Sequence, residues 1–460
     1  MLSTGMFIAS SAFLPSSFAM TMNMYAMAAF LNEKCASHHR FYAIICTAIS
    51  ALIGWPFAAI LGMPVVIDML FFRPKVKMFW YFTSLSGIFV GGILLSFDSY
   101  YYGKRVLAPL NIVLYNVFSE HGPDIYGVEP LSYYLKNLIL NWNIAVFLIP
   151  LAVPLSVLNY FHSWKALEQY KKWGIPLHPL YWRHYSPIFL IYITLVAWCI
   201  IFFNQSHKEE RFLFPIYPLI ALLAAVSLDS AERLINRYIP SFSFVSWLTV
   251  MFFILASISR TFALHKNFSA HIEIYKSLNE HLMEHQRDLD FSLRADPLRL
   301  CVGKEWYRFP SSFFLPEVAV DSRNIKREIN LHFLKSEYSG ALPNYYPQGR
   351  LPFITRRIPA GMNDMNKEEP SRYVELDTCD YVIDLETPDH VLPHEPNFGA
   401  MVYYFSSQSN VFRRLYAHLF LISSKSHWFY RAFFIPYLSV RRTSFANYTL
   451  YERIPPTVRA

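Results

Sequence analysis

The chain has 460 residues, of which 54% are hydrophobic and only 16% are charged, and its formal net charge is +8. Globular domains carry about 25% charged residues, so this composition excludes an ordinary soluble protein and indicates a polytopic membrane protein with a soluble portion. The positive charge does not indicate nucleic-acid binding, because no basic run is longer than the pairs Lys171–Lys172 and Arg441–Arg442. We assign it to loops that flank the membrane.

Seven apolar segments within residues 1–264 predict about seven membrane spans. In chain order they are Gly5–Phe30, Phe41–Phe72, Phe79–Phe97, Leu138–Phe161, Pro187–Phe203, Phe212–Leu228 and Phe242–Leu264. Pro15 lies in the middle of the first segment, which predicts either one span or a pair of short helices. The second segment is too long for one straight helix and contains Pro56 and Pro64. We expect a kinked span with an interfacial extension, since a packed bundle tolerates helix breakers.

Basic loops set the predicted topology, because cytoplasmic loops carry an excess of Lys and Arg. If the loop from Lys165 to His184 is cytoplasmic, counting spans in both directions places two further basic segments on the same side. These are the Arg73–Lys77 turn and the Arg233–Arg237 loop. The polar loops 98–130 and 204–211, together with everything after Leu264, then fall in the lumen.

Residues 265–460 are soluble in character and predict a luminal domain of mixed α/β structure. The stretch around His281 predicts an amphipathic helix. Three short stretches that begin at Leu300, Arg372 and Tyr381 alternate or run apolar as strands do, and turns that contain proline separate them.

Sequons and cysteines bear on the compartment of this domain. Among the sequons, the one at Asn447 lies far from any span, so Asn447 is the predicted glycosylation site. The five cysteines show no CxxC or other metal-ligand spacing, which argues against a metal site built from cysteine. In an oxidising lumen Cys301 and Cys379 are able to pair, and two free thiols fit the sequence equally well.

The most unusual polar segment is the ionisable run His207–Arg211, which lies between two uncharged apolar runs of 17 residues each. Such a segment must lie at a membrane–water boundary, because charge is costly in hydrocarbon. Its cations and histidine suit the phosphate of a lipid headgroup, and its carboxylates suit proton acceptance from an attacking hydroxyl. The alternative is that these residues pair with one another and fix two helix ends, with Ser206 and Glu209 forming a capping box.

The segment His207–Leu219 resembles the signature of the GT-C mannosyltransferases that use dolichyl-phosphate mannose. Within that class, in glycosyltransferase family 22, the whole chain resembles the α-1,2-mannosyltransferases of lipid-linked oligosaccharide assembly, the asparagine-linked glycosylation nine type. The stretches that carry the resemblance are Ser11–Ser17, Asp98–Lys104, Ala108–Phe118, His121–Asp124, Val302–Ser312 and Glu368–Tyr373.

The resemblance implies a GT-C-like helix bundle in the endoplasmic-reticulum membrane with its C-terminal domain in the lumen. It implies transfer of mannose from dolichyl-phosphate mannose in α-1,2 linkage to a dolichyl-pyrophosphate-linked high-mannose oligosaccharide, for protein N-glycosylation. Because the donor is β-linked and the product α-linked, the reaction inverts the anomeric centre. Such a displacement needs a carboxylate base and stabilisation of the leaving phosphate. No metal or other cofactor and no nucleic acid is expected.

Residue roles follow from the resemblance and from the predicted luminal face. The candidate catalytic bases are Glu209, Glu210, Asp98 and Asp124. The candidate substrate-binding residues are His207, Lys208, Arg211, Tyr100, Tyr101 and Lys104. For the two tyrosines, an interfacial aromatic belt is the alternative.

The chain departs from this family at its start. Before the point that matches Met1, family members carry at least one more span and a first luminal loop with an acidic pair, which holds the proposed base. No residue here matches that loop, so the chain resembles an N-terminally truncated product, an alternative start or an incomplete gene model. It is then either an active enzyme that uses one of its own luminal carboxylates or an impaired fragment that retains lipid and glycan binding. A transporter or channel is disfavoured, because the charges cluster at span ends.

Overall fold

The computed structural model describes residues 2–32, 36–118, 123–172, 185–239, 243–284, 289–291, 294, 297–308, 312–386 and 411–454, with the backbone alone for residues 123 and 163–172. These residues form two compact units. The first contains Met1–Ile258 and Pro347–Arg357, and the second contains Ser259–Tyr346 and Ile358–Ala460. The predicted boundary at residue 264 falls shortly after Ile258. In the predicted cytoplasmic loop, residues 173–184 lie outside the described residues.

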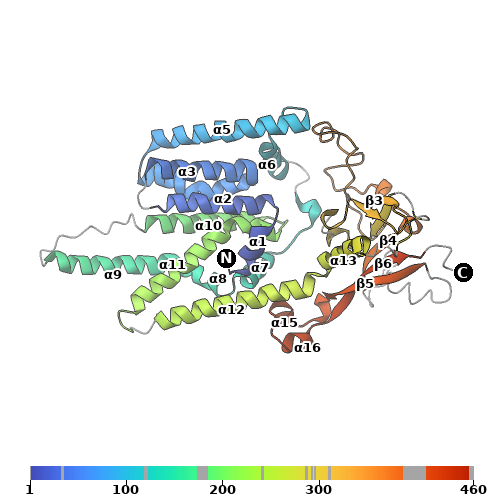
Figure 1. The fold of residues 1–460 in the computed structure, drawn as a ribbon. Coiled ribbons are helices and arrows are strands. Elements are labelled where there is room, and N and C mark those ends of the chain that lie inside the picture. Colours follow the sequence, from blue (N-terminus) through green and yellow to red (C-terminus); the bar gives the residue numbers. More distant parts are fainter. Residues whose placement is uncertain are drawn as a thin grey trace. The chain divides into compact units, whose positions relative to one another are not determined.

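The first unit is a bundle of helices that run side by side (Figure 1). Its α-helices are α1 (Thr4–Ser11), α2 (Pro15–Phe30), α3 (Ser37–Ile49), α4 (Met63–Ile67), α5 (Val76–Tyr102), α6 (Ala108–Phe118), α7 (Ser132–Trp142), α8 (Ile144–Leu148), α9 (Ala152–Lys172), α10 (Ser186–Asn204), α11 (Tyr217–Ile235) and α12 (Ser243–Phe268), the last of which continues into the second unit. Buried side chains from α2, α10 and α11 contribute to one continuous apolar core.

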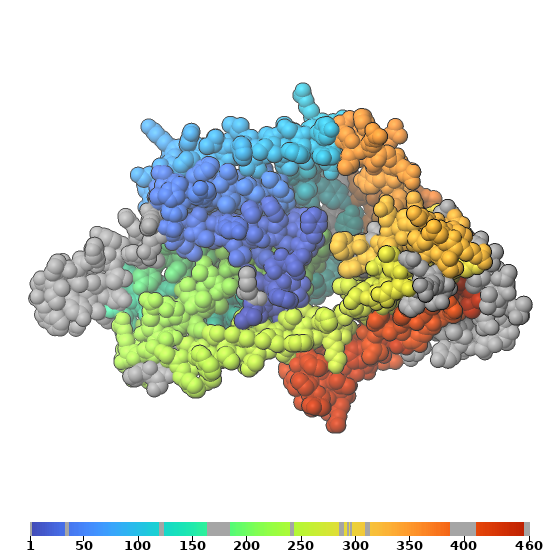
Figure 2. Space-filling view, in the orientation of Figure 1, coloured from blue at the N-terminus to red at the C-terminus, as the bar shows by residue number. Residues whose placement is uncertain are grey.

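Five helices of the described residues are long and apolar enough to cross a membrane. They are Val76–Tyr102, Ile144–His162, Ser186–Asn204, Glu210–Ile235 and Ser243–Phe268. The chain is therefore a multi-pass membrane protein. α5 and α12 lie on the outside of the bundle, where only 17% and 11% of their apolar windows are buried, as expected of helices that face lipid (Figure 2).

The first two predicted spans are the broken ones. α1 and α2 form a pair bent by 111°, and the bend is placed by Pro15, which begins α2 because its ring suits the first helical position. Between α3 and α5 the chain passes through short π and 3-10 turns, and residues 56–72 form an apolar helix shorter than a span. The predicted count of about seven spans stays a prediction.

The second unit is built on a six-stranded sheet, which confirms the predicted mixed α/β domain. Its strands are β1 (Leu298–Val302), β2 (Val318–Val320), β3 (Lys326–Phe333), β4 (Tyr381–Glu386), β5 (Phe412–Leu421) and β6 (Phe445–Arg453), in the order β2-β3-β1-β4-β6-β5. β1 pairs in parallel with β3 and β4, and the remaining pairs are antiparallel. α13 (Ala270–Glu284) packs its apolar face, with Ile274 and Leu278, against this sheet.

The prediction of a strand that begins at Arg372 was wrong. Residues Pro370–Arg372 form a 3-10 turn, and Tyr373 makes only a single bridge to Phe333. Proline suits the first position of such a turn, and the side chain of Glu369 accepts a hydrogen bond from the backbone of Ser371, so local capping competes with strand formation. The strands expected at Leu300 and Tyr381 are β1 and β4, and the expected helix around His281 is α13, with His285 outside the described residues.

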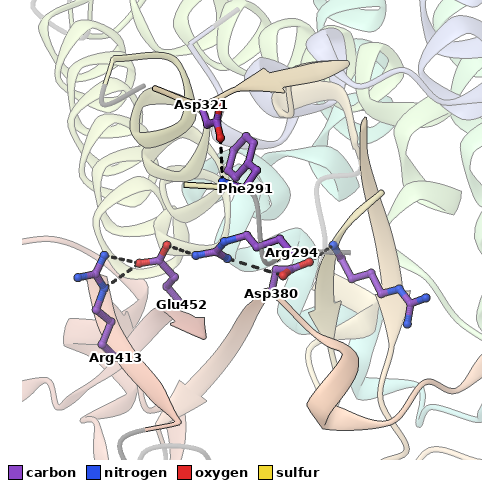
Figure 3. A network of polar contacts seen from close by, with 7 residues as sticks. Phe291, Arg294, Asp321, Asp380, Arg413 and Glu452 are labelled. Carbon is purple, nitrogen blue, oxygen red and sulfur yellow. Dashed lines mark hydrogen bonds and ion pairs between the residues drawn. The ribbon is translucent and has the colours of Figure 1, made fainter. Parts of the chain in front are cut away.

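A buried polar network ties together strands that are distant in sequence (Figure 3). The Glu452 carboxylate on β6 accepts from Arg294 Nη2 at 2.5 Å and from Arg413 Nη2 on β5 at 2.6 Å. Asp380, just before β4, accepts from the backbone N–H of Arg299 on β1 at 2.9 Å. Both carboxylates are buried, so these partners compensate for the lost hydration.

Cys301 on β1 and Cys379 form a disulfide, which settles the alternative left open by the sequence. Both residues are fully buried. The bond closes a separation of 78 residues and joins β1 to the segment that leads into β4.

Candidate functional site

The ionisable run lies between two helices of the first unit. α10 ends at Asn204, where Gln205 turns to an extended conformation, and a 3-10 turn over Glu210–Ile216 leads into α11. Pro215 and Pro218 favour this tight turn over a longer α-helix, because each lacks a backbone N–H donor. The predicted run therefore lies at the end of one membrane helix and the start of the next.

Glu209 is the centre of the charged cluster. Arg211 approaches it with two nitrogens, Nε at 2.6 Å from Oε2 and Nη2 at 2.7 Å from Oε1. His207 Nε2 lies 3.1 Å from Oε1. A two-point guanidinium–carboxylate pair fixes orientation, and it leaves the remaining guanidinium donors for a ligand.

A second polar segment, Asp124–Glu129, lies against this cluster. Ser206 Oγ donates to Asp124, His207 Nδ1 lies 2.8 Å from the carbonyl oxygen of Gly127, and the Glu129 N–H donates to the Ser206 carbonyl at 3.0 Å. The two predicted luminal loops thus meet within the first unit. The capping box of Ser206 and Glu209, which was the alternative interpretation of this run, does not form, because these side chains bind Asp124 and Arg211 instead.

Lys208 and Glu210 point away from the Glu209–Arg211 pair. Lys208 is only 7% exposed, and its ammonium donates to the carbonyls of Glu129 at 2.9 Å and of Gln205. The Glu210 carboxylate accepts from Asn141 Nδ2 at 2.7 Å. Burial raises the pKa of the nearby Tyr133 phenol, and the Glu210 carboxylate raises it further, so this phenol stays neutral. These contacts hold the two loops and α7 together.

The candidate site residues at the end of α5 have other partners than the Glu209 cluster. Asp98 Oδ2 accepts from the N–H of Ala108 at 3.1 Å, at the start of α6. The carbonyl of Tyr100 accepts from Arg356 Nη2 at 2.8 Å, and that of Tyr101 accepts from Thr355 Oγ1 at 2.7 Å, while both phenols are exposed. Lys104 is also exposed.

A cavity of about 320 Å³ adjoins the charged cluster. Its apolar walls include Trp55, Phe57, Phe202 and Phe212, and α6 contributes Ile112, Asn116 and Val117. Its charged lining comes from one loop and consists of His207, Glu209 and Arg211. Of the predicted site residues only these three line this cavity; Asp98, Asp124, Tyr100, Tyr101, Lys104, Lys208 and Glu210 do not.

The aromatic walls were not found by sequence reasoning. Trp55 stacks on Phe212 with ring centroids 5.1 Å apart and meets Trp198 edge-on at 5.7 Å. Trp198 Nε1 donates to the Phe212 carbonyl at 3.2 Å. The available signals were the Trp55–Pro56 break in an apolar run and an apolar helix, α6, too short to cross the membrane.

The predicted glycosylation site lies in the second unit on β6, an inner strand between β4 and β5. Asn447 Nδ2 donates to Glu386 at 3.0 Å and Thr449 Oγ1 donates to it at 2.8 Å. Burial raises the pKa of Glu386, but hydrogen bonds from Tyr451, Asn447 and Thr449 outweigh burial, so its pKa lies below the usual range. Since Thr449 is fully buried, modification of Asn447 has to precede pairing of β6. Glycosylation there stays a prediction.

Within the described ranges, no group of three His, Cys, Asp or Glu side chains is arranged to hold a metal ion. The expectation that catalysis needs no metal stays a prediction.

Comparison with known proteins bears directly on the predicted family. Residues 1–316 match the model of the Alg9-like mannosyltransferase family. The chain is 42% identical over 455 residues to the alpha-1,2-mannosyltransferase algn-9 of Caenorhabditis elegans, covering 98% of this chain and 71% of that protein. It is 40% identical over 460 residues to the alpha-1,2-mannosyltransferase ALG9 of Homo sapiens, covering 98% of this chain and 69% of that protein.

A more distant relative agrees with these two. The chain is 32% identical over 457 residues to the alpha-1,2-mannosyltransferase alg9 of Schizosaccharomyces pombe, covering 95% of this chain and 71% of that protein. No solved structure matches. The family predicted from the motifs is confirmed and the chain is a glycosyltransferase: it belongs to the Alg9-like mannosyltransferase family.

Proposed function

We propose that this enzyme transfers mannose from dolichyl-phosphate mannose, in α-1,2 linkage, to a dolichyl-pyrophosphate-linked high-mannose oligosaccharide for protein N-glycosylation. Family membership and the activity for which the relatives are named support the transfer and its linkage. The observation that carries the choice of donor is the cavity of the first unit, which combines aromatic and aliphatic walls with a charged lining.

The lining of this cavity suits an amphiphilic ligand with an apolar tail and an anionic head. Trp55, Phe57 and Phe202 offer an apolar surface to an isoprenoid chain. Arg211 and His207 offer donors to a phosphate, and Glu209 holds both in place. As the mannosyl bond breaks, negative charge grows on the phosphate, and donors fixed beforehand stabilise it more in the transition state than in the ground state.

The inverting step also needs a base that takes the proton of the acceptor hydroxyl. Among the candidate carboxylates, Glu209 lines the cavity, but its two oxygens already accept from Arg211 and His207. Asp124 is exposed beside the cluster and accepts from Ser206. We assign Glu209 to positioning of the phosphate donors and Asp124 to proton acceptance, in a reaction that uses no metal or other cofactor.

We further place the second unit in the lumen of the endoplasmic reticulum. The Cys301–Cys379 disulfide supports an oxidising compartment. The Asn447 sequon supports the same side.

The test is mannose transfer in microsomes that lack the endogenous enzyme. The 460-residue chain is supplied and, in parallel, a form extended at its N-terminus, with dolichyl-phosphate mannose and a six-mannose lipid-linked acceptor. The expected result is transfer by the 460-residue chain and loss of this transfer in Asp124→Asn. Transfer by the extended form alone supports the alternative, a fragment that retains lipid and glycan binding. Transfer by neither form contradicts the proposed donor and acceptor.

A further inference from the structure

A segment of the second unit between β5 and β6 has an unusual composition. Residues 427–442 contain α15 (Trp428–Ala432), a proline-containing turn and α16 (Leu438–Arg442). Their sequence, HWFYRAFFIPYLSVRR, is rich in aromatic and aliphatic residues and carries three arginines and no acidic residue. From the sequence, this region was predicted to be part of a soluble domain.

This segment is hydrogen-bonded to the end of α12. Ser259 Oγ donates to the Phe434 carbonyl at 2.9 Å, and the Phe434 N–H donates back to the Ser259 carbonyl at 3.1 Å. Arg260 Nη1 and Asn267 Nδ2 donate, each at 3.0 Å, to backbone carbonyls of α15. α15 and α16 accordingly lie beside the C-terminal part of α12 (Figure 1). All these residues belong to the second unit.

The position of these contacts relative to the membrane follows from α12, which is long and apolar enough to cross it. Residues 243–259 carry no charge, and Arg260 and Lys266 follow. A run of about 17 to 20 apolar residues fills the hydrocarbon layer, so the membrane–water boundary lies near Arg260. The segment 427–442 is therefore held at the boundary, where lipid headgroups lie.

The outward side of the segment is apolar. Ala432 and Ser439 face inward and are buried. Trp428 is 68% exposed and Tyr437 is 85% exposed, and Leu438 and Val440 are exposed as well. Such a cluster is costly in water, and Trp and Tyr are the residues enriched where a protein meets the interface of a bilayer.

The charges of the segment fit a surface that carries phosphate groups. Arg441 and Arg442 are exposed, and neither forms an ion pair with any residue in the described part of the chain. They follow directly on the exposed Leu438 and Val440. Guanidinium groups pair with lipid phosphates while neighbouring apolar side chains enter the acyl boundary.

We propose that residues 427–442 form a membrane-interface anchor that attaches the second unit to the lipid surface. Trp428, Tyr437, Leu438 and Val440 enter the headgroup region, and Arg441 and Arg442 bind phospholipid phosphates. The anchor adds to the covalent link through α12 and holds the sheet domain in a fixed orientation to the bilayer. This inference does not depend on the identity of the sugar donor or on which side of the membrane the unit lies.

The test measures the depth of a fluorophore at position 440 in the full chain, reconstituted in phospholipid nanodiscs. Val440→Cys is labelled with an environment-sensitive dye in a background that replaces the three cysteines outside the Cys301–Cys379 disulfide, through Cys35→Ser, Cys46→Ser and Cys199→Ser. The matched control is Lys326→Cys, an exposed position at the start of β3, which is separated from β5 by three strands. The expected result is strong quenching at 440 by lipids that carry a spin label near the headgroup, and little quenching at 326.

Equal quenching at both positions, or a solvent-exposed emission spectrum at 440, overturns the proposal. A shielded dye at 440 that spin-labelled lipid does not quench also overturns it and indicates a protein partner on this surface. A second variant tests the role of charge. Arg441→Glu combined with Arg442→Glu should reduce quenching at 440 several-fold, whereas Lys425→Glu, outside the segment, should leave it unchanged.

Discussion

At the scale of single residues, the cluster around Glu209 separates roles that the sequence cannot separate. Five neighbouring ionisable residues suggest one site, but their side chains diverge. Lys208 is buried against two backbone carbonyls and Glu210 turns to Asn141, while Arg211 and His207 converge on Glu209 beside the cavity. The backbone changes conformation within the run, because Glu209 is extended and the 3-10 turn begins only at Glu210, so neighbouring side chains point in different directions.

Arg211→Ala should lower kcat/KM for dolichyl-phosphate mannose about 10- to 100-fold, mainly through kcat, because Arg211 acts most strongly in the transition state and a hydrogen bond to a charged group contributes about 1.5–3 kcal/mol. Transfer rates measured over a range of donor concentrations check this. Arg233→Ala is the matched control, since Arg233 also pairs with a carboxylate in the same unit, Asp229 at 2.9 Å, but lies at the other end of α11. Unchanged donor KM and kcat in Arg211→Ala would remove this residue from the site.

At the scale of helices and strands, the sequence-based predictions were most accurate for elements that one continuous stretch encodes through its periodicity or its long apolar run. The five long helices coincide with predicted spans because each is encoded by one continuous stretch. β6 shows the opposite case: it is buried on both faces, so it lacks the alternation of a half-exposed strand. Its polar residues find partners far away in sequence, such as Glu386 for Thr449 and Arg294 for Glu452. No local sequence pattern indicates pairing between residues so far apart in the chain.

The cavity wall shows the same limit. α6 contributes Ile112 to the cavity, yet its sequence records only a short apolar helix. Trp55 and Phe212 come from elements far apart in the chain and meet only in the folded bundle. The charged lining of the cavity was therefore predictable, and its apolar walls were not.

α6 also offers a test of the cavity. Ile112→Trp places a larger ring in space that we assign to the lipid chain of the donor, so donor KM should rise about tenfold or more, a loss of about 1.4 kcal/mol. Leu110→Trp is the control, because Leu110 is exposed on the same helix and does not line the cavity. Both variants are compared in the transfer assay at equal membrane levels. A KM in Ile112→Trp equal to that of Leu110→Trp would show that the donor binds elsewhere.

At the scale of the whole molecule, the order of the spans is consistent with one topology. If each of the five long helices crosses the membrane, counting the crossings predicts that residues 98–104, the 204–211 loop and the chain after α12 share one side. The contacts between residues 124–129 and 206–208 agree, because both segments lie at one level of the bundle. The Arg233–Arg237 segment then lies on the opposite side.

This topology predicts which positions a membrane-impermeant maleimide reaches in sealed microsomes. The chain carries Cys35→Ser, Cys46→Ser and Cys199→Ser, so that outside the Cys301–Cys379 disulfide the only cysteine is the one that replaces Tyr238, Val128 or Lys326, all of which are exposed. Tyr238→Cys, between α11 and α12, should react in intact microsomes because the basic loops face the cytoplasm. Val128→Cys and Lys326→Cys should react only after permeabilisation.

The three positions together distinguish the ways in which the topology can fail. Labelling of Val128→Cys in intact vesicles, with Tyr238→Cys protected, means that the whole bundle has the opposite orientation, and the positive-inside argument is then wrong. Labelling of both in intact vesicles means that α9, α10 and α11 together do not cross the membrane an odd number of times. Labelling of Lys326→Cys in intact vesicles, with Val128→Cys protected, places only the second unit in the cytoplasm. The Cys301–Cys379 bond would then have to survive in a reducing compartment, which disulfides rarely do.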